Sequence, residues 1–254
     1  MLRVNSLFSV NLFVTGLLAG LLILPLAGCS SDDKKADTAE AAYEQAQSFD
    51  KDERYEEAIR RYQEVKNKYP YSKFATMAEL AIADAYYRQE SFPEAQVSYQ
   101  TFKELHPKHP QSDYVTYKLG MSFFEQLPST TDRDLSLSES ALLYFDEVLA
   151  VYPKSEHAKD AAQKKEDTLK KLADKEMYIA DFYFKRKTYL SALPRYEGLL
   201  KNYPNLGYDQ KALLRAAQSA ARLGELDRAK QYAAKLQKDF RDSAEAREIA
   251  DELK

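Results

Sequence analysis

Three histidines are the first residues to test for chemistry, because imidazole binds metals and transfers protons. His106 and His109 lie in the run His106-Pro107-Lys108-His109-Pro110, and His157 stands apart from them. A zinc site needs three or four ligands, and the chain offers neither a cysteine cluster nor two histidines at the helical i, i+4 spacing. We therefore expect no metal site.

The motifs of nucleophilic and phosphate chemistry are also missing. The sequence has no Gly-x-Ser-x-Gly and no glycine-rich phosphate loop. Carboxylates are plentiful, but they stand among lysines on expected helix faces, where solvation explains them. The sequence predicts no catalytic residue and no enzyme activity. Its net charge of −3 supplies no basic field for binding nucleic acid.

Cys29 is the single cysteine, and it lies in an uncharged run between Arg3 and Asp32. An apolar stretch that ends in small residues is typical of a secretory signal. The residues Leu26-Ala27-Gly28-Cys29 resemble the lipobox of bacterial lipoproteins, in which a signal peptidase cuts before a cysteine that carries diacylglycerol. We expect Cys29 to become the first residue, with covalent N-acyl and S-diacylglycerol lipid and no other cofactor.

Two other interpretations of this segment stay open. Residues 4–31 are long enough to span a bilayer as an uncleaved helix, for which about 20 apolar residues suffice. The segment could also be an ordinary secretory signal in which Cys29 is incidental.

The elements that position the remaining residues are predicted to be helices. The chain has 7 glycines, of which Gly16, Gly20 and Gly28 precede Cys29. Ala, Glu, Lys and Leu are abundant, and no Asn-Gly or Asp-Gly pair marks a hairpin of strands. This composition indicates an all-α protein.

One pattern recurs five times, and each copy is marked by an alanine: Ala58, Ala95, Ala141, Ala192 and Ala229. An aromatic residue follows, at Tyr62, Tyr99, Phe145, Tyr196 and, one place early, Tyr232. A proline stands twelve residues after the first four alanines, at Pro70, Pro107, Pro153 and Pro204. The alanine lets a second helix approach closely, the aromatic residues fill the gap, and the proline ends the helix. The pattern predicts a repeated helical hairpin.

This hairpin resembles the tetratricopeptide repeat, whose period is about 34 residues. The copies here are spaced by 37, 46, 51 and 37 residues, and only Gly224 occupies the turn position where that repeat has glycine. We interpret the departures as lengthened helices and loops. The predicted fold is an all-α, right-handed solenoid of about five tetratricopeptide-like helical hairpins.

Three segments depart from the simple repeat. The polar residues 128–134 predict a surface loop inside the third copy. Residues 155–187 contain neither proline nor glycine and predict one helix of about 32 residues, or about 48 Å, with Ser155 as its N-cap. Its charged residues form either a solvated face or a docking surface. Residues 243–253 predict a final helix that caps the stack.

A solenoid of hairpins has a concave face that is lined by the first helix of each pair and can hold an extended peptide. Tyr86, Tyr87 and Arg88 lie on one such helix, and Tyr114 and Tyr117 lie on the next. Tyrosine suits both a core and a ligand contact, because its body is apolar and its tip is polar. Both interpretations stay open for each tyrosine.

Beyond the repeats, several stretches resemble the BamD family of outer-membrane assembly lipoproteins: Asn67-Lys68-Tyr69-Pro70, Ala85-Tyr86-Tyr87, His106-Pro107-Lys108-His109-Pro110, Asp113-Tyr114-Val115, Asp132-Arg133-Asp134 and Arg195-Tyr196-Glu197-Gly198. The resemblance covers roughly residues 24–245. It implies a lipid-anchored scaffold on the periplasmic face of the outer membrane of a Gram-negative bacterium.

The resemblance also implies partners and site residues. The N-terminal repeats would receive C-terminal segments of unfolded outer-membrane proteins, through Tyr86, Tyr87, Arg88, Tyr114 and Tyr117, with Arg88 for a carboxylate. The C-terminal repeats would dock on the periplasmic domains of BamA, the barrel-forming subunit, through Arg195 and Glu197. Other assembly lipoproteins are further partners that the resemblance allows.

The expected organisation has four parts: a signal peptide over 1–28, a tether over 29–37, repeats 1–3 over 38–153, and repeats 4–5 with the long helix and the cap over 154–254. A lipoprotein that scaffolds another envelope complex, such as a pilus secretin or a division assembly, is the alternative function.

Overall fold

The computed structural model describes residues 37–253, and this part of the chain is helical without any strand. Cys29 and the expected signal segment lie outside the described residues. No helix in the described range is both long enough and apolar enough to cross a membrane. The helices are α1 (Ala39–Lys51), α2 (Tyr55–Lys68), α3 (Lys73–Arg88), α4 (Phe92–Leu105), α5 (Ser112–Phe124), α6 (Leu137–Val151), α7 (Ala158–Lys185), α8 (Tyr189–Asn202), α9 (Asp209–Arg222), α10 (Leu226–Asp239) and α11 (Ala244–Glu252).

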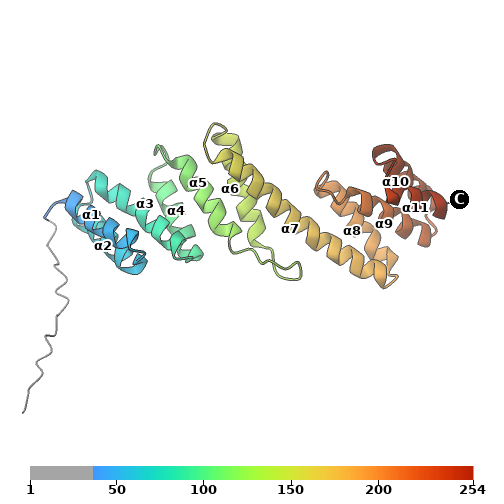
Figure 1. The fold of residues 1–254 in the computed structure, drawn as a ribbon, viewed down its shortest axis with the longest axis horizontal. Coiled ribbons are helices and arrows are strands. Elements are labelled where there is room, and N and C mark those ends of the chain that lie inside the picture. Colours follow the sequence, from blue (N-terminus) through green and yellow to red (C-terminus); the bar gives the residue numbers. More distant parts are fainter. Residues whose placement is uncertain (1–36, 254) are drawn as a thin grey trace, which may run out of the picture. The chain divides into compact units, whose positions relative to one another are not determined.

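Consecutive helices pack against each other from α1 to α10, and α11 packs on both α9 and α10 (Figure 1). We call α1, α3, α5, α7 and α9 the A helices and their partners α2, α4, α6, α8 and α10 the B helices. Each A helix and the following B helix form one hairpin. The all-α fold of tetratricopeptide-like hairpins is therefore confirmed.

The repeated residues lie where the pattern predicts. All five marker alanines are 0% exposed, and Tyr62, Tyr99, Phe145 and Tyr196 are at most 1% exposed. Helices α2, α4, α6 and α8 each end two residues before a proline. The residue between has left the α region, as at Tyr69, where φ is −129° and ψ is 52°. The last hairpin ends in the same way at Phe240 without a proline.

The turn from each A helix to its B helix uses a residue with positive φ in four of the hairpins. These residues are Glu53 (59°), Glu90 (61°), Lys187 (61°) and Gly224 (81°). In each turn the next N–H returns to a carbonyl five residues earlier, as Ser91 does to Tyr86 at 2.9 Å. Glutamate and lysine thus occupy three positions that favour glycine.

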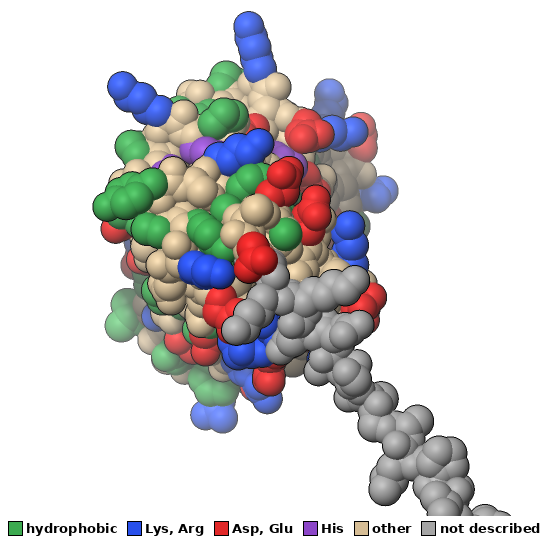
Figure 2. Space-filling view, turned by 90° about the vertical axis from the view of Figure 1, so that its left-hand side faces the viewer, with side chains coloured by type: hydrophobic (Ala, Val, Ile, Leu, Met, Phe, Trp, Pro, Cys, Tyr) green, Lys and Arg blue, Asp and Glu red, His purple; other side chains and the backbone are tan. Residues whose placement is uncertain are grey.

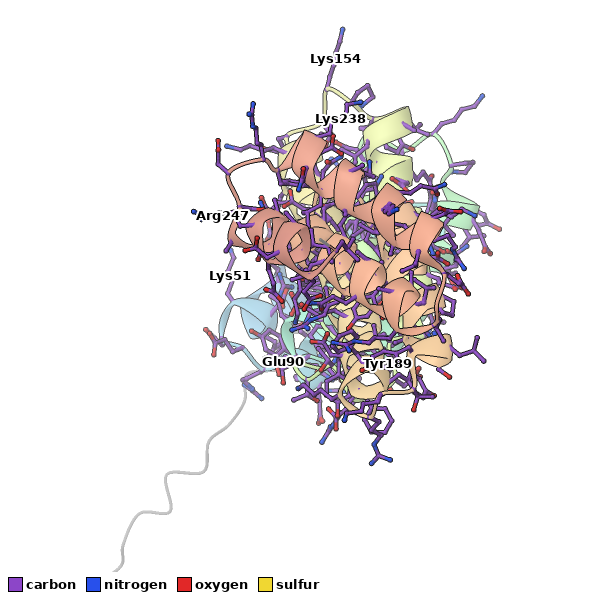
Figure 3. All side chains as sticks on the ribbon, turned by 90° about the vertical axis from the view of Figure 1, so that its right-hand side faces the viewer. Lys51, Glu90, Lys154, Tyr189, Lys238 and Arg247 are labelled. Atoms are coloured by element: carbon purple, nitrogen blue, oxygen red, sulfur yellow. The ribbon has the colours of Figure 1, made fainter. Side chains whose placement is uncertain are left out.

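The two kinds of turn lie at opposite edges of the array of hairpins. Figure 3 shows Glu90 and Tyr189, which belong to A-to-B turns, at one edge. Lys154 and Lys238, which lie near the ends of B helices, are at the other edge. Lys51, at the end of α1, lies between these two edges in the same view.

Helix α7 has 28 residues and begins at Ala158, three residues after the predicted N-cap. Ser155 instead accepts the N–H of His157 at 3.1 Å and donates to Asp113 at 2.6 Å. Lys171 and Lys175 donate to backbone carbonyls of the 128–134 loop, at 3.1 and 2.9 Å. These two lysines of α7 therefore hold the inserted loop against the helix. The sequence had predicted only a solvated face or a docking surface for the charged residues of this helix.

Candidate functional site

Polar side chains connect each A helix to the A helix of the next hairpin, and they connect the last A helix, α9, to α11. The contacts are Asp50 with Arg88 at 2.5 Å, Asp84 with Tyr114 at 2.8 Å, Asp160 with Tyr117, Asp174 with Tyr208 at 2.6 Å, and Gln218 with Glu248 of α11 at 2.9 Å. Hydrogen bonds to charged groups stabilise more strongly than neutral ones. The ladder therefore helps to fix the angle between successive hairpins.

Asp84 of α3 lies at the centre of the N-terminal part of this ladder. Its Oδ1 accepts hydroxyl hydrogen bonds from Tyr99 at 2.6 Å and Tyr114 at 2.8 Å. Burial raises the pKa of Asp84, and the two hydroxyl groups oppose that rise. Burial, together with the Asp84 charge, raises the pKa of both tyrosines. The carboxylate is thus held by neutral donors.

Lys118 of α5 lies beside this carboxylate, with its Nζ 3.1 Å from the centre of the Tyr87 ring. Burial lowers the pKa of Lys118 to about 8, against the opposing charges of Asp84 and Glu125. No hydrogen bond or ion pair joins this ammonium to another of the described residues. The contact with the aromatic face is a cation–π interaction.

Tyr117 extends the aromatic surface toward α7. Its ring stacks on that of His157, with centroids 4.9 Å apart and planes 7° apart, and its hydroxyl donates to Asp160. Burial raises the pKa of Tyr117, and it raises the pKa of Tyr87 to about 12. Both side chains therefore remain protonated near neutral pH.

The structure brings four of the predicted peptide-binding residues to one face. The rings of Tyr114 and Tyr117 both contact that of His157, with centroids 5.5 and 4.9 Å apart. Lys118 lies over the Tyr87 ring, and Arg88 is near enough to act on its charge. We call Tyr87, Arg88, Tyr114, Tyr117 and Lys118 the N-terminal A-face. Lys118 was not anticipated from the sequence, because a single lysine among 37 basic residues carries no motif.

Tyr86 does not join the N-terminal A-face. It packs against two clusters of buried residues, one that includes Ile82 and one that includes Leu80. It also lines a hollow between α2 and α4 together with Val97 and Leu105. Tyr86 therefore faces α2 and α4, whereas Tyr87 lies under Lys118 of α5.

Arg88 is present on the N-terminal A-face but is already paired. Its guanidinium binds Asp50 at 2.5 Å and lies 5.9 Å from the Tyr55 ring centre. The Asp50 side chain is only 10% exposed, so removing Arg88 would leave a buried charge without its partner. Arg88 therefore has a structural role between α1 and α3.

The two predicted docking residues face different neighbours. Arg195 of α8 pairs with Glu176 of α7 at 3.1 Å. Glu197, two residues later, accepts hydrogen bonds from Arg228 and Tyr232 of α10. The structure thus separates Arg195 and Glu197 onto two sides of α8.

An offset of 97 residues, as in 181 − 84, relates the Asp84 cluster to a second cluster in the C-terminal half. Tyr99 corresponds to Tyr196, which donates to Asp181 at 2.7 Å. Lys118 corresponds to Arg215, whose Cζ lies 4.5 Å from the centre of the Phe184 ring. The full correspondence pairs Asp84, Tyr87, Tyr99, Tyr114 and Lys118 with Asp181, Phe184, Tyr196, Lys211 and Arg215.

The face of the molecule shown in Figure 2 has no single dominant charge. On the face shown in Figure 2, basic and acidic side chains are interspersed with hydrophobic ones. Within residues 37–253, no group of three or more His, Cys, Asp or Glu side chains could hold a metal ion. The N-terminal A-face consists of aromatic rings, hydroxyl groups and single charges.

A family model and several known proteins are similar to this chain. Residues 35–236 match the YfiO family, which is described as outer membrane lipoprotein. The outer membrane protein assembly factor BamD of Neisseria meningitidis is 30% identical over 214 residues, which cover 78% of this chain and 80% of the relative. BamD of Vibrio cholerae is 28% identical over 229 residues, 84% of this chain and 95% of the relative. Among solved structures, Pseudomonas aeruginosa PilF is similar with a TM-score of 0.42 at 16% identity, covering 87% of this chain and 84% of PilF.

Proposed function

Because the chain belongs to the YfiO family of outer membrane lipoproteins, we propose that it is an assembly factor for outer-membrane proteins. The observation that carries this proposal is the similarity to relatives named as outer membrane protein assembly factor over most of both chains. In this role the protein is a scaffold without catalytic activity. It receives unfolded outer-membrane proteins and passes them to the barrel-forming subunit.

The N-terminal A-face is the proposed receiving surface. Tyr87 and Tyr117 present partly buried rings, and their raised pKa values keep the hydroxyl groups neutral. A preformed aromatic surface can cover the apolar side chains of an extended segment without an ordering cost of its own. Such contacts are weak enough to be reversed when the segment is handed on.

The C-terminal hairpins are the proposed docking region for the barrel-forming subunit. Arg195 and Glu197 lie on two sides of α8, so they would contact the partner at two points rather than as one pair. Arg195 keeps about half of its side chain exposed and is the more accessible of the two.

The proposed membrane attachment is the acyl lipid on Cys29 at the periplasmic face of the outer membrane. Two or more acyl chains bind a bilayer stably, whereas one chain binds only marginally. We expect Cys29→Ala to leave the hairpins folded and to release the protein from membranes. Continued tight association without a partner protein would contradict this anchor.

The proposed function is tested by affinity purification from detergent-solubilised envelopes. We expect the tagged chain to recover a large barrel protein with periplasmic repeats. Recovery of secretin or division proteins alone would instead assign the scaffold to another envelope complex.

The receiving surface is tested with Tyr87→Ala and Tyr117→Ala and a labelled peptide that ends in an aromatic residue. Tyr71→Ala is the matched control, because Tyr71 is fully exposed in the turn between α2 and α3, outside the N-terminal A-face. We expect the first two variants to bind the peptide more weakly while remaining helical, and the control to bind like the parent. Parental binding by both Tyr87→Ala and Tyr117→Ala would show that this surface is wrongly placed.

A further inference from the structure

The offset of 97 residues shows one position at which the two related clusters differ in charge. In the C-terminal cluster Lys211 binds Asp181 at 2.6 Å. The corresponding residue in the N-terminal cluster is Tyr114, which offers Asp84 a neutral hydroxyl. Among the described residues, Asp84 therefore has hydroxyl donors and no direct ion pair, although Arg88 and Lys118 act on its charge from a longer distance.

Each cluster has a cation over an aromatic ring, Lys118 in one and Arg215 in the other, and these two cations have different hydrogen-bond partners. Arg215 donates a hydrogen bond to Oε1 of Gln218 at 2.8 Å in addition to its contact with Phe184. Lys118 has only the Tyr87 ring, since no described residue lies within ion-pair or hydrogen-bond distance of its Nζ. An ammonium group that is partly buried and lacks a partner would gain from an anionic ligand.

The surroundings of Lys118 restrict what that anion can be. Asp84 and Arg88 on α3 and Glu125 at the end of α5 act on it electrostatically, and the Tyr87 ring covers it. Asp160 of α7 lies close enough to act on Tyr87 and Tyr117. These carboxylates repel a strongly acidic ligand, whereas one negative charge on an apolar segment suits a single ammonium among tyrosine rings.

We propose that Lys118 binds the C-terminal carboxylate of an extended apolar peptide on the N-terminal A-face. This inference rests on the proposed receiving surface and moves the carboxylate contact from Arg88, which is committed to Asp50, to Lys118. A chain terminus brings a single charge directly beside an apolar side chain. Lys118 thereby makes the surface selective for the end of a client chain.

The test compares two peptides on the full-length protein in detergent. Both are ten residues long, alternate polar residues with Tyr or Phe, and end in Phe, one as a free acid and one as an amide. Fluorescence anisotropy measures each dissociation constant. We expect the acid to bind about tenfold more tightly than the amide, because a charge-assisted hydrogen bond is lost in the amide.

Three variants connect this preference to Lys118. Lys118→Met should bind both peptides with the affinity of the amide, and Lys118→Arg should keep a preference for the acid. Lys103→Met is the matched control, because Lys103 also lies over a tyrosine ring, at 5.2 Å from that of Tyr144, but is paired with Glu147 between α4 and α6. The control should keep the full preference, and circular dichroism checks that each variant is folded.

The preference should also depend on pH. Because the ligand binds the charged form of Lys118, whose pKa is about 8, affinity for the acid should begin to fall near about pH 7 and should level off above about pH 9 at the affinity of the amide, about tenfold lower. Affinity for the amide should stay constant over the same range, since the raised pKa values of Tyr87, Tyr114 and Tyr117 keep them neutral.

The outcomes separate this inference from the proposed function. If neither peptide binds, both the proposed receiving surface and the role of Lys118 are contradicted. Equal binding of acid and amide by the parent would keep the surface and overturn the role of Lys118. A third peptide, an amide with one internal Glu, should bind like the plain amide; if it binds like the acid, recognition of a chain terminus is refuted.

Discussion

Asp84 and Asp181 occupy equivalent places in two hairpins, yet their carboxylates are satisfied in different ways. Asp84 accepts two tyrosine hydroxyl groups, whereas Asp181 accepts one from Tyr196 and pairs with Lys211. The framework around them is shared, including a fully buried tyrosine on the B helix. An exchange of tyrosine for lysine on the next A helix therefore replaces a neutral donor to the carboxylate with an ion pair.

We infer that the two halves of the chain have different roles. In the C-terminal cluster both cations have partners within the chain, which favours a fixed platform for docking. In the N-terminal cluster Lys118 remains without a polar partner among the described residues, which favours transient binding of a ligand. The same repeat can thus carry either role with few substitutions.

The largest expected effect comes from removing the buried hydroxyl group in each cluster. Tyr99→Phe should lower the free energy of unfolding by about 1.5–3 kcal/mol, because Asp84 would keep only the Tyr114 hydroxyl. Tyr196→Phe should lower it by about 1 kcal/mol, since Lys211 still neutralises Asp181. Urea denaturation followed by circular dichroism measures both. Equal losses would show that the two carboxylates are held equally well.

The second effect concerns two helical glycines. A Cβ on Gly120 of α5 would lie 2.9 Å from Cε1 of Phe145, which is 0% exposed, whereas a Cβ on Gly198 of α8 would meet nothing within 4 Å. Gly120→Ala should therefore lower the free energy of unfolding by about 1–3 kcal/mol. Gly198→Ala should raise it by about 0.5–1 kcal/mol through helix propensity. A stabilised Gly120→Ala would mean that α5 and α6 are less tightly packed than described.

The smallest effect comes from the A-to-B turns, in which both halves should behave alike. Glu53→Gly, Glu90→Gly and Lys187→Gly should each raise the free energy of unfolding by about 0.5–1 kcal/mol, because glycine adopts positive φ without strain. Their side chains are exposed, so little packing is lost. Gly224→Ala is the reverse control and should lower the same quantity by about 1 kcal/mol. Destabilisation by all three glycines would show that side-chain contacts outweigh backbone strain.

Much of the fold could be predicted because each repeat encodes its own packing. A small residue such as Ala95 must be buried for a B helix to approach, and a proline such as Pro107 must end that helix. These constraints act within one hairpin and leave a visible pattern. The turns at Glu53, Glu90 and Lys187 have the same positive φ as the turn at Gly224, although glutamate and lysine do not indicate such a turn in the sequence.

The candidate site was only partly predictable because it depends on contacts between hairpins. Arg88 and Asp50 are 38 residues apart, and Tyr117 and Asp160 are 43 apart, so no local motif announces either pair. Tyr86 looked equivalent to Tyr87 in sequence but points to another side of α3. Lys118 differs from Arg215 in lacking a hydrogen-bond partner for its charged group among the described residues, and only the folded arrangement reveals that difference.

The most direct test of the account is photo-crosslinking in growing cells with p-benzoylphenylalanine at Tyr117 or at Val97. Tyr117 lies on the N-terminal A-face, whereas Val97 is 67% exposed on α4 beside the hollow that holds Tyr86. We expect adducts with unfolded outer-membrane proteins at position 117 and few at position 97. Adducts mainly at position 97, or none at position 117, would contradict the claim that the N-terminal A-face receives client chains.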